Sequence, residues 1–464
     1  MPVPAPEDTA VMSPRKVALA SSIGATIEWY DFFIYGTASA LIFNKLFFSN
    51  LPPEVGTLVA LATFAVGYLA RPLGAVIFGH LGDRVGRKKM LILTMVIMGV
   101  ATFLIGLLPT YDQIGVWAPV LLILLRVLQG VGVGGEYGGA VLMAVEYAPT
   151  GRRGFYGSWP QVGVPAGLLL ASGMFSLLSL MADDAFLSWG WRVAFLSTIV
   201  LAGIGLYIRL QVLETPAFAQ VKQAQDEAKI PFMDLLRSHP KQLLQGMGTR
   251  WIEGLTFNAY AVLAVAYTVQ YADVARTTVL NAIVVGAAFG VVLTPVYGHL
   301  SDRFGRKKVY GTGVVAIALF TFPSFAMLRT GSTPLIFLSI VLGLGIIYSA
   351  IYAPLAAFWS ELFETRVRYT GVGSVYQFSG IYASGLTPLI GAALIQYAGG
   401  EPWLFAAYMV AVAVLSLVVM AFMPETYLKD INPVVSADSL STGGGPERDA
   451  TGRLSPTVAE PGER

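Results

Sequence analysis

Apolar runs long enough to cross a lipid bilayer recur along the whole of this chain. A membrane-spanning helix needs roughly 20 mostly apolar residues, and twelve such runs occur in the 464 residues. Hydrophobic residues make up 55% of the chain and charged residues only 12%, whereas a soluble domain typically carries about 25% charged residues. The sequence therefore predicts an all-α membrane protein with twelve transmembrane helices. The predicted spans cover residues 17–43, 54–80, 90–109, 117–147, 154–181, 190–213, 242–270, 277–300, 309–328, 333–361, 370–398 and 402–423.

The basic residues between the spans predict the orientation of the chain. Most of them fall in loops that share one side if the spans alternate, whereas the opposite loops hold Lys45, Arg276, Arg329 and several acids. Because basic loops stay on the cytoplasmic side, both termini are predicted to be cytoplasmic, in the inner (plasma) membrane. The first apolar run is too long for a signal peptide and lacks a cleavage site. The basic loop residues are Arg84, Arg87, Lys88, Lys89, Arg152, Arg153, Arg303, Arg306, Lys307, Lys308, Arg366 and Arg368.

Metal and thiol chemistry have little support in the sequence. The chain contains no cysteine, which excludes disulfides and thiolate catalysis. Its three histidines, His80, His239 and His299, are scattered and lack the spacing of metal ligands. We therefore expect no metal, no cofactor and no enzymatic activity.

The chain carries an internal duplication. Residues 79–89 read GHLGDRVGRKK and residues 298–308 read GHLSDRFGRKK, 219 positions further on. Three other matches have similar offsets, and four matches at nearly constant spacing are unlikely to arise by chance. The sequence therefore predicts two pseudo-symmetric six-helix bundles. The other matches are Glu146 and Arg153 with Glu361 and Arg368, Gly157-Ser158-x-x-Gln161 with Gly373-Ser374-x-x-Gln377, and Glu214-Thr215 with Glu425-Thr426.

The duplication also predicts the domain organisation. A charged stretch at 220–241 contains two prolines and an amphipathic piece near 231–237, as expected of a cytoplasmic linker. Parallel repeats of this kind are a transporter architecture, with a substrate site near the membrane midplane between the halves. The predicted parts are a cytoplasmic tail at 1–16, a six-helix bundle at 17–219, the linker at 220–241, a six-helix bundle at 242–428 and a disordered cytoplasmic tail at 429–464.

These motifs resemble those of the major facilitator superfamily, whose signature is the G-x-L-x-D-R-x-G-R-K-K loop after spans 2 and 8. The resemblance covers residues 15–428. Within it, EWYDF from Glu28, the pair Arg71-Pro72 and RVLQGVGVGGEYGG from Arg126 resemble the metabolite:proton symporter family, and 56–94 is most similar to its shikimate-permease-like members. The resemblance implies proton-coupled transport of shikimate, dicarboxylates, citrate, 2-oxoglutarate or proline and betaine, by a monomeric functional unit.

Two carboxylates, Glu28 and Asp31, lie near the centre of the first span. A charge there costs about 2.5–3.5 kcal/mol on insertion scales, so it is tolerated mainly beside a cavity or a partner. Three residues apart, both lie on one helix face, and two such acids cannot both ionise cheaply in a low dielectric. We expect them to carry the coupled proton, the alternative being static hydrogen bonds. In related proton-coupled sugar porters an aspartate in span 1 pairs with an arginine in span 4, and Asp31 and Arg126 match that pattern.

Other polar residues in the spans are candidate substrate ligands. Span 7 holds Arg250 and Glu253, which either neutralise each other or face a cavity. Gln161 and Gln377 occupy equivalent depths in spans 5 and 11 and supply donors and acceptors without charge, although such residues also bond across helices. The predicted substrate contacts are Arg126, Gln161, Arg250, Glu253, Asn258, Tyr260, Gln377 and Tyr30.

The loop motifs predict a gate at the cytoplasmic side. Acids and bases at fixed positions can form ion pairs that hold one state closed and break in the other, whereas topology alone needs only the bases. The alternative is that the bases only face anionic lipid. The predicted gate residues are Asp83, Arg84, Arg87, Glu146, Arg153, Asp302, Arg303, Arg306, Glu361 and Arg368.

The expected function is import of a small organic carboxylate, shikimate-like or a dicarboxylate, by proton-coupled alternating access. Symport of a zwitterionic osmolyte such as proline or betaine is the first alternative, and a solute-sensing receptor the second. A drug antiporter of the same superfamily would carry G-x-x-x-G-P-x-x-G-G in span 5, which here reads GSWPQVGVPAG from Gly157.

Overall fold

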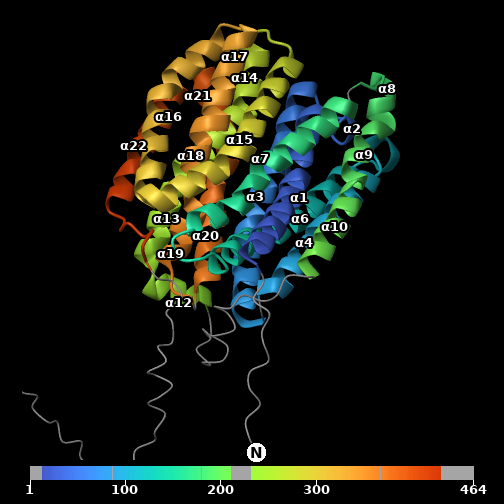
Figure 1. The fold of residues 1–464 in the computed structure, drawn as a ribbon. Coiled ribbons are helices and arrows are strands. Elements are labelled where there is room, and N and C mark those ends of the chain that lie inside the picture. The colour runs from blue at the N-terminus through green and yellow to red at the C-terminus, as the bar shows by residue number, and fades with distance from the viewer. Residues whose placement is uncertain (1–12, 86, 179, 211–230, 366, 430–464) are drawn as a thin grey trace, which may run out of the picture. The chain divides into compact units, whose positions relative to one another are not determined.

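The computed structural model describes residues 13–85, 87–178, 180–210, 231–365 and 367–429, and every element in them is helical. Most of the predicted tails and half of the predicted linker lie outside the described residues. The remainder of the linker holds one short amphipathic helix, α12 (Pro231–Ser238), where the sequence predicts it. The spans follow one another along the chain and gather into two bundles (Figure 1).

The first five spans of the first bundle begin and end within five residues of the predicted limits, and the sixth begins seven residues before its predicted start. Short helices at α2 (Phe43–Leu46) and α5 (Tyr111–Ile114) join some of them, and the sixth span is a run of short helices with one π-helical turn. The spans are α1 (Pro14–Leu41), α3 (Pro53–Val85), α4 (Arg87–Leu107), α6 (Trp117–Glu146), α7 (Arg153–Leu178) and the run of α8 (Asp183–Ala185), η1 (Phe186–Gly190), α9 (Trp191–Leu196) and α10 (Thr198–Leu210).

The second bundle repeats this arrangement, but π-helical turns interrupt three of its six spans. Such turns widen a helix by one residue and often mark functional sites. The spans are α13 (Pro240–Asn258) with η2 (Ala259–Leu263) and α14 (Ala264–Tyr271), α15 (Arg276–Phe304), α16 (Arg306–Arg329), α17 (Thr333–Ile340) with η3 (Val341–Ile347), α18 (Tyr348–Tyr352) and α19 (Leu355–Leu362), α20 (Arg368–Gly380) with η4 (Ile381–Gly385) and α21 (Thr387–Tyr397), and α22 (Trp403–Ala421).

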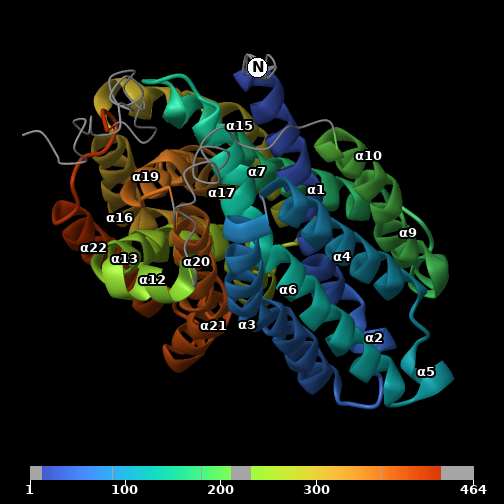
Figure 2. The same cartoon turned by 90° about the horizontal axis from the view of Figure 1, so that it is seen from below.

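Eleven of the twelve predicted spans are helices long and apolar enough to cross a membrane within the described ranges. The twelfth, α1, is 28 residues long and packs against α6 and α7. It falls outside that set because its two carboxylates lower its hydropathy. With α1 included, the fold is the predicted pair of six-helix bundles, which group on opposite sides when seen along the helices (Figure 2).

Glycines allow α3 and α6 to approach very closely. A Cβ atom at Gly74 would lie 2.0 Å from the carbonyl oxygen of Val131, and one at Gly134 would lie 2.1 Å from that of Arg71. Those distances are far inside van der Waals contact, so no other residue fits without a backbone shift. Gly134 therefore allows α6 to pack directly on the backbone of α3 at Arg71.

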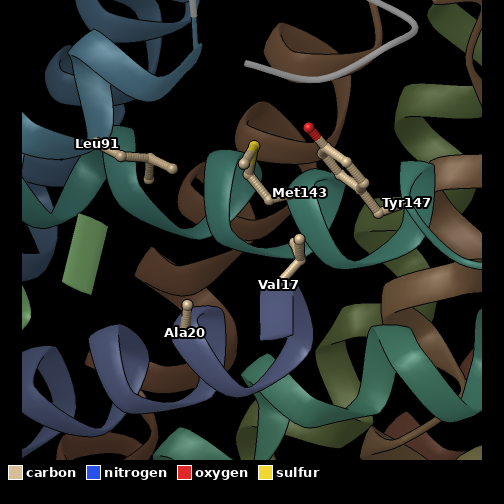
Figure 3. Packing of buried hydrophobic residues seen from close by; sticks show 5 residues of the cluster. All are labelled: Val17, Ala20, Leu91, Met143 and Tyr147. Carbon is tan, nitrogen blue, oxygen red and sulfur yellow. The ribbon is translucent and has the colours of Figure 1, made fainter. Parts of the chain in front are cut away.

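The first turns of α1 are anchored at one end of the molecule. Val17 and Ala20 of α1 pack on Leu91 of α4 and on Met143 and Tyr147 at the end of α6 (Figure 3). The end of the described chain lies near the start of α7, since Arg153, the first residue of α7, donates a hydrogen bond to the carbonyl of Lys429 at 2.6 Å. The beginning of α1 and the end of α22 therefore lie at the same end. We call it the basic end, because the basic loop motifs lie there.

Candidate functional site

Asp31 is fully buried in the middle of α1, with 0% of its surface exposed. Neither of its carboxylate oxygens has a hydrogen-bond partner of normal geometry among the residues described. Its polar neighbours include the hydroxyl of Thr102 on α4 and the carboxylate of Glu136 on α6. Charge without donors is costly in a low dielectric, so these surroundings are compatible with the role of proton carrier that the sequence predicts for Asp31.

The predicted direct ion pair between Asp31 and Arg126 is wrong for this conformation. Arg126 is 1% exposed and makes no ion pair within the described ranges. Its guanidinium carbon lies 4.0 Å from the ring centroid of Tyr35 and 4.9 Å from that of Phe32. Cation–π contact with these rings stabilises the guanidinium where it lies.

A chain of polar side chains joins the two residues instead. Arg126 Nη1 donates to Oε1 of Gln129 at 2.5 Å, and Nε2 of Gln129 donates to Oγ1 of Thr102 at 2.7 Å. Thr102 is in turn the polar neighbour of Asp31. The two predicted members of the proton site are therefore connected through residues of α4 and α6 that the sequence analysis did not select.

Glu28 lies one turn before Asp31 but reaches different neighbours. It is 4% exposed and lies within electrostatic range of Tyr137 on α6, whereas Asp31 neighbours Thr102 on α4. Glu28 thus borders the cluster of tyrosines described next, and Asp31 lies within the first bundle.

Arg250 and Glu253 form the charged part of a cluster between the bundles. The two side chains make a buried ion pair across one turn of α13. Oε1 of Glu253 also accepts a hydrogen bond from the hydroxyl of Tyr348 at 2.8 Å. The guanidinium carbon of Arg250 lies 4.3 Å from the ring centroid of Tyr376, and its Nη2 donates to Ser384 at 3.3 Å. The ion pair is therefore embedded in hydroxyl groups and aromatic rings.

Four tyrosines surround that ion pair, and none of them was predicted. Tyr137 of α6 stacks on Tyr376 of α20 with a centroid separation of 3.6 Å and an interplanar angle of 11°. Tyr348 stacks on Tyr352 at 5.2 Å. All four are less than 10% exposed. Because Tyr137 belongs to the first bundle and the other three to the second, the stacking closes the centre between the bundles.

Gln161 and Gln377 are brought to equivalent places by the internal symmetry. Nε2 of Gln161 donates to the carbonyl of Tyr352 at 3.1 Å, and Nε2 of Gln377 donates to the carbonyl of Val133 at 3.1 Å. Each glutamine therefore bonds to the opposite bundle. In both, Oε1 is buried and has no partner within the described chain, which leaves an acceptor free on each side of the centre.

Besides Arg126, which lies against rings of the first bundle, three predicted substrate contacts do not join this cluster. The hydroxyl of Tyr30 donates to the carbonyl of Ala194 at 3.1 Å, inside the first bundle. That of Tyr260 bonds to Ser324 at 2.8 Å, inside the second. Asn258 donates to the carbonyl of Gly254 in its own helix at 2.9 Å. Their position in a span could be predicted, but the direction of each side chain depends on the neighbouring helix.

The basic end is closed by bonds between the bundles. Nη1 of Arg368 lies 3.0 Å from Oε1 of Glu146, with both side chains almost fully buried. The backbone amides of Gly154 and Phe155, at the start of α7, donate to the two oxygens of Asp302 at 2.7 and 2.8 Å. An acid at a helix N-terminus is favoured by the unpaired amides and by the helix dipole.

Arg306 ties this contact to the rest of the second bundle. Its guanidinium lies 2.8 Å from Asp302 and 3.0 Å from Glu361. Arg153 of the first bundle acts electrostatically on the same Glu361. The hydroxyl of Thr426 also donates to Glu361, at 2.5 Å. These predicted gate residues therefore form one buried network that spans both bundles.

Not every predicted gate residue joins the network. Arg303 is exposed and lies over the ring of its neighbour Phe304, at 5.2 Å. The side chains of Asp83, Arg84 and Arg87 lie outside the described part of the structure. The exposure of Arg303 follows from helix geometry, because its neighbours at 302 and 306 share the face turned toward the first bundle.

Adjacency to a selected motif was the only signal for some of the missed residues. Tyr137 lies within the glycine-rich motif after Arg126, and Tyr376 directly precedes Gln377. Gln129 lies in the same motif, three residues after Arg126, whereas Thr102 lies in an apolar run with nothing along the sequence to single it out. Within the described ranges, no three His, Cys, Asp or Glu residues are grouped so that they could hold a metal ion.

Two family models match the chain, one in each half. Residues 17–242 match the family described as "Sugar (and other) transporter", and residues 246–445 match the Major Facilitator Superfamily. Among solved structures, the proton:xylose symporter XylE bound to 6-bromo-6-deoxy-D-glucose superposes with a TM-score of 0.72 over 90% of this chain and 98% of that chain, at 17% sequence identity.

Curated relatives match nearly the whole length at higher identity. The shikimate transporter of Escherichia coli is 42% identical over 89% of this chain and 95% of its own length. The glycine betaine/proline/ectoine/pipecolic acid transporter OusA of Dickeya dadantii is 38% identical over 92% of this chain and 86% of its own length.

Proposed function

We propose, since this chain belongs to the major facilitator superfamily of transporters, that it imports a small organic carboxylate together with a proton. The observation that carries the proposal is Asp31, a buried acid whose two oxygens lack hydrogen-bond partners among the described residues. Such a group gains and loses a proton without breaking ion pairs of its own. The relatives are transporters and not enzymes, and one similar structure is named a proton:xylose symporter.

The relatives also support the substrate class. One is named a shikimate transporter, and others carry proline, betaine, ectoine or pipecolic acid. These molecules share a carboxylate and differ in the rest. We assign recognition of the substrate to the cluster between the bundles, where Gln161 and Gln377 each keep a free acceptor oxygen and Arg250 and Glu253 supply charge. Hydroxyl groups of a ring acid would donate to those two amide oxygens.

In the proposed cycle, the conformation described above is the one that is closed at the basic end. Protonation of Asp31 and binding of the substrate would permit the bonds at Glu146, Arg368 and Asp302 to open. Loss of the proton on the other side would reset the transporter. Arg126 senses the state of Asp31 through Thr102 and Gln129 in this scheme.

We further propose that both termini and the basic end are cytoplasmic in the bacterial inner membrane. The arginines and lysines gathered in the loops at that end support the assignment, because basic loops stay on the cytoplasmic side. A single chain is proposed as the functional unit, since the proposed site lies between the two bundles of one chain.

A zwitterionic osmolyte is the second candidate substrate. The stacked pairs Tyr137–Tyr376 and Tyr348–Tyr352 present aromatic faces in the centre, and aromatic faces bind quaternary ammonium groups. Such a substrate would also bring a carboxylate.

Uptake into proteoliposomes with an imposed pH gradient tests the proposal. We expect radiolabelled shikimate to accumulate above its external concentration when the outside is acidic, and the accumulation to collapse when a protonophore is added. Accumulation of glycine betaine without that of shikimate would support the second candidate. Equilibration that ignores the pH gradient would contradict proton coupling, and binding without any flux would indicate a receptor.

A further inference from the structure

Arg71, in the middle of α3, is a buried arginine without an acid. Only 1% of its surface is exposed, and its Nη2 atom has no hydrogen-bond partner within the described part of the chain. Its guanidinium carbon lies 4.2 Å from the ring centroid of Tyr68 and 4.4 Å from that of Phe32. Aromatic faces thus hold the cation in place while donors remain unused.

Each of the other arginines of the centre has at least one polar partner, although Nε and Nη2 of Arg126 have none within the described ranges. Arg250 is paired with Glu253, and Arg126 donates to Gln129 at 2.5 Å. At the basic end, Arg306 and Arg368 pair with glutamates. Arg71 therefore differs from them in having neither a carboxylate nor an amide acceptor, although a guanidinium buried at membrane depth is costly without one.

Arg71 faces the boundary between the bundles. It acts electrostatically on Tyr376 of the second bundle, and a Cβ atom added at Gly385 would lie 3.2 Å from its neighbour Tyr68. Tyr376 is the ring that also lies against Arg250. The guanidinium therefore borders the cluster that we assign to the substrate.

Arg71 also lies beside the proton site. The ring of Phe32 is in contact with both Arg71 and Arg126, with guanidinium-to-centroid distances of 4.4 and 4.9 Å, and Phe32 follows Asp31 in the chain. Two cations on one ring repel each other, and neither makes an ion pair with a residue that the structure describes. An anion placed next to Arg71 would offset that repulsion.

We propose that Arg71 is the residue that binds the carboxylate of the substrate. A carboxylate fits the planar fork of a guanidinium with two parallel hydrogen bonds, which a neutral ester, an amide or an alcohol cannot match. This inference rests on the proposed function, because it names the residue that selects the proposed substrate class. It predicts that the acid is bound through the first bundle, next to the proton site.

Binding to the purified, full-length transporter tests the proposal with matched pairs of ligands. Shikimate is compared with its methyl ester, and glycine betaine with choline, so that each pair differs mainly in the carboxylate. We expect Arg71→Gln to weaken binding of the acid by about tenfold or more, the scale of a lost charge-assisted hydrogen bond, with no comparable loss for the partner that lacks the carboxylate. The affinity of Arg71→Lys for the acid should lie between those of Arg71→Gln and the native protein, because lysine keeps the charge but lacks the planar fork of the guanidinium.

Arg192→Gln is the matched control, since Arg192 is a part-buried arginine that donates to the carbonyls of Gly106 and Leu108 at 2.8 and 2.7 Å within the first bundle. It should keep the native preference for acids. If Arg71→Gln fails to fold, as judged by gel filtration, the same comparison is made with Arg71→Lys. An unchanged preference for the acid over the ligand without a carboxylate in the folded variants would overturn the assignment of Arg71. A native protein that binds neither acid would overturn the proposed function as well.

Discussion

The carboxylate of Glu146 lies 3.0 Å from the guanidinium of Arg368, although 222 residues separate them. Each belongs to one copy of a repeated Glu-x6-Arg motif. Glu146 is followed by Arg153 in the first copy, and Glu361 is followed by Arg368 in the second. The reciprocal contact is also made, since Arg153 of the first motif acts electrostatically on Glu361 of the second. The duplicated motif therefore joins the two bundles.

Charge reversal at Glu146 and Arg368 should show whether this ion pair holds a gate closed or whether its residues only set the topology of the chain. Arg368→Glu places two acids together and should favour opening of the basic end, by the 1–3 kcal/mol that is typical of switching couplings. Glu146→Arg combined with Arg368→Glu should restore part of the native behaviour. Because the native chain has no cysteine, the labelling rate of a single Ser158→Cys, buried at that end, reports the opening. Equal labelling in all variants would indicate that the pair is no gate.

Removal of the charge at Asp302 should weaken the same closure by another route. Asp302→Asn takes a carboxylate from the amides of Gly154 and Phe155, and loss of a helix cap costs about 0.5–2 kcal/mol. We expect slower transport with little change in substrate affinity. Asp183→Asn is the control, because Asp183 is an exposed acid outside the network. A native transport rate in Asp302→Asn would show that capping of α7 by Asp302 does not hold the basic end closed.

Replacement of Asp31 should uncouple transport from the proton. Asp31→Asn is expected to abolish accumulation driven by a pH gradient, because no proton can be released. Exchange of labelled for unlabelled substrate should remain measurable, since exchange needs no net change of protonation. Glu28→Gln is expected to have a milder effect. Full accumulation by Asp31→Asn would show that the proton is carried elsewhere.

Thr102 offers a test of the polar chain between Asp31 and Arg126. Thr102→Val removes the hydroxyl that accepts from Gln129 at 2.7 Å and keeps the shape of the side chain. We expect fewer protons to move with each substrate molecule, as measured by the reversal potential of transport. Thr321, 219 positions further on, is equally buried and donates to its own helix at Ile317, so Thr321→Val is the matched control. An identical number of protons per substrate molecule in both variants would exclude Thr102 and Gln129 as a relay between Asp31 and Arg126.

Loss of the free amide oxygens should affect recognition of the substrate. Gln161→Glu and Gln377→Glu keep an acceptor oxygen but add a negative charge. A leucine at either position removes the acceptor oxygen. We expect the leucine variants to bind a hydroxylated acid about tenfold more weakly, the cost of about one hydrogen bond to a buried acceptor, and an unhydroxylated acid nearly as before. Isothermal titration with shikimate and benzoate measures the difference. A parallel loss for both ligands would assign the glutamines to packing.

The sequence by itself determined the spans, the duplication and many members of the buried network at the basic end. Hydropathy acts along one helix, so runs of about 20 apolar residues are visible without a fold, and repeated motifs such as those at Asp302 and Arg306 can be aligned by eye. Burial of Glu28, Asp31, Arg126 and Arg250 also follows, because each lies inside an apolar run.

Only the tertiary structure decided which of these groups meet. Asp31 was expected to pair with Arg126, but the rings of Phe32 and Tyr35 hold the guanidinium, and Thr102 and Gln129 lie between. Arg71 likewise lies against the rings of Phe32 and Tyr68, and no acid among the described residues pairs with it. The rotation of each helix about its axis depends on side chains from other helices, some of them more than 200 residues away along the chain. The pattern of residues within a single span therefore does not predict that rotation.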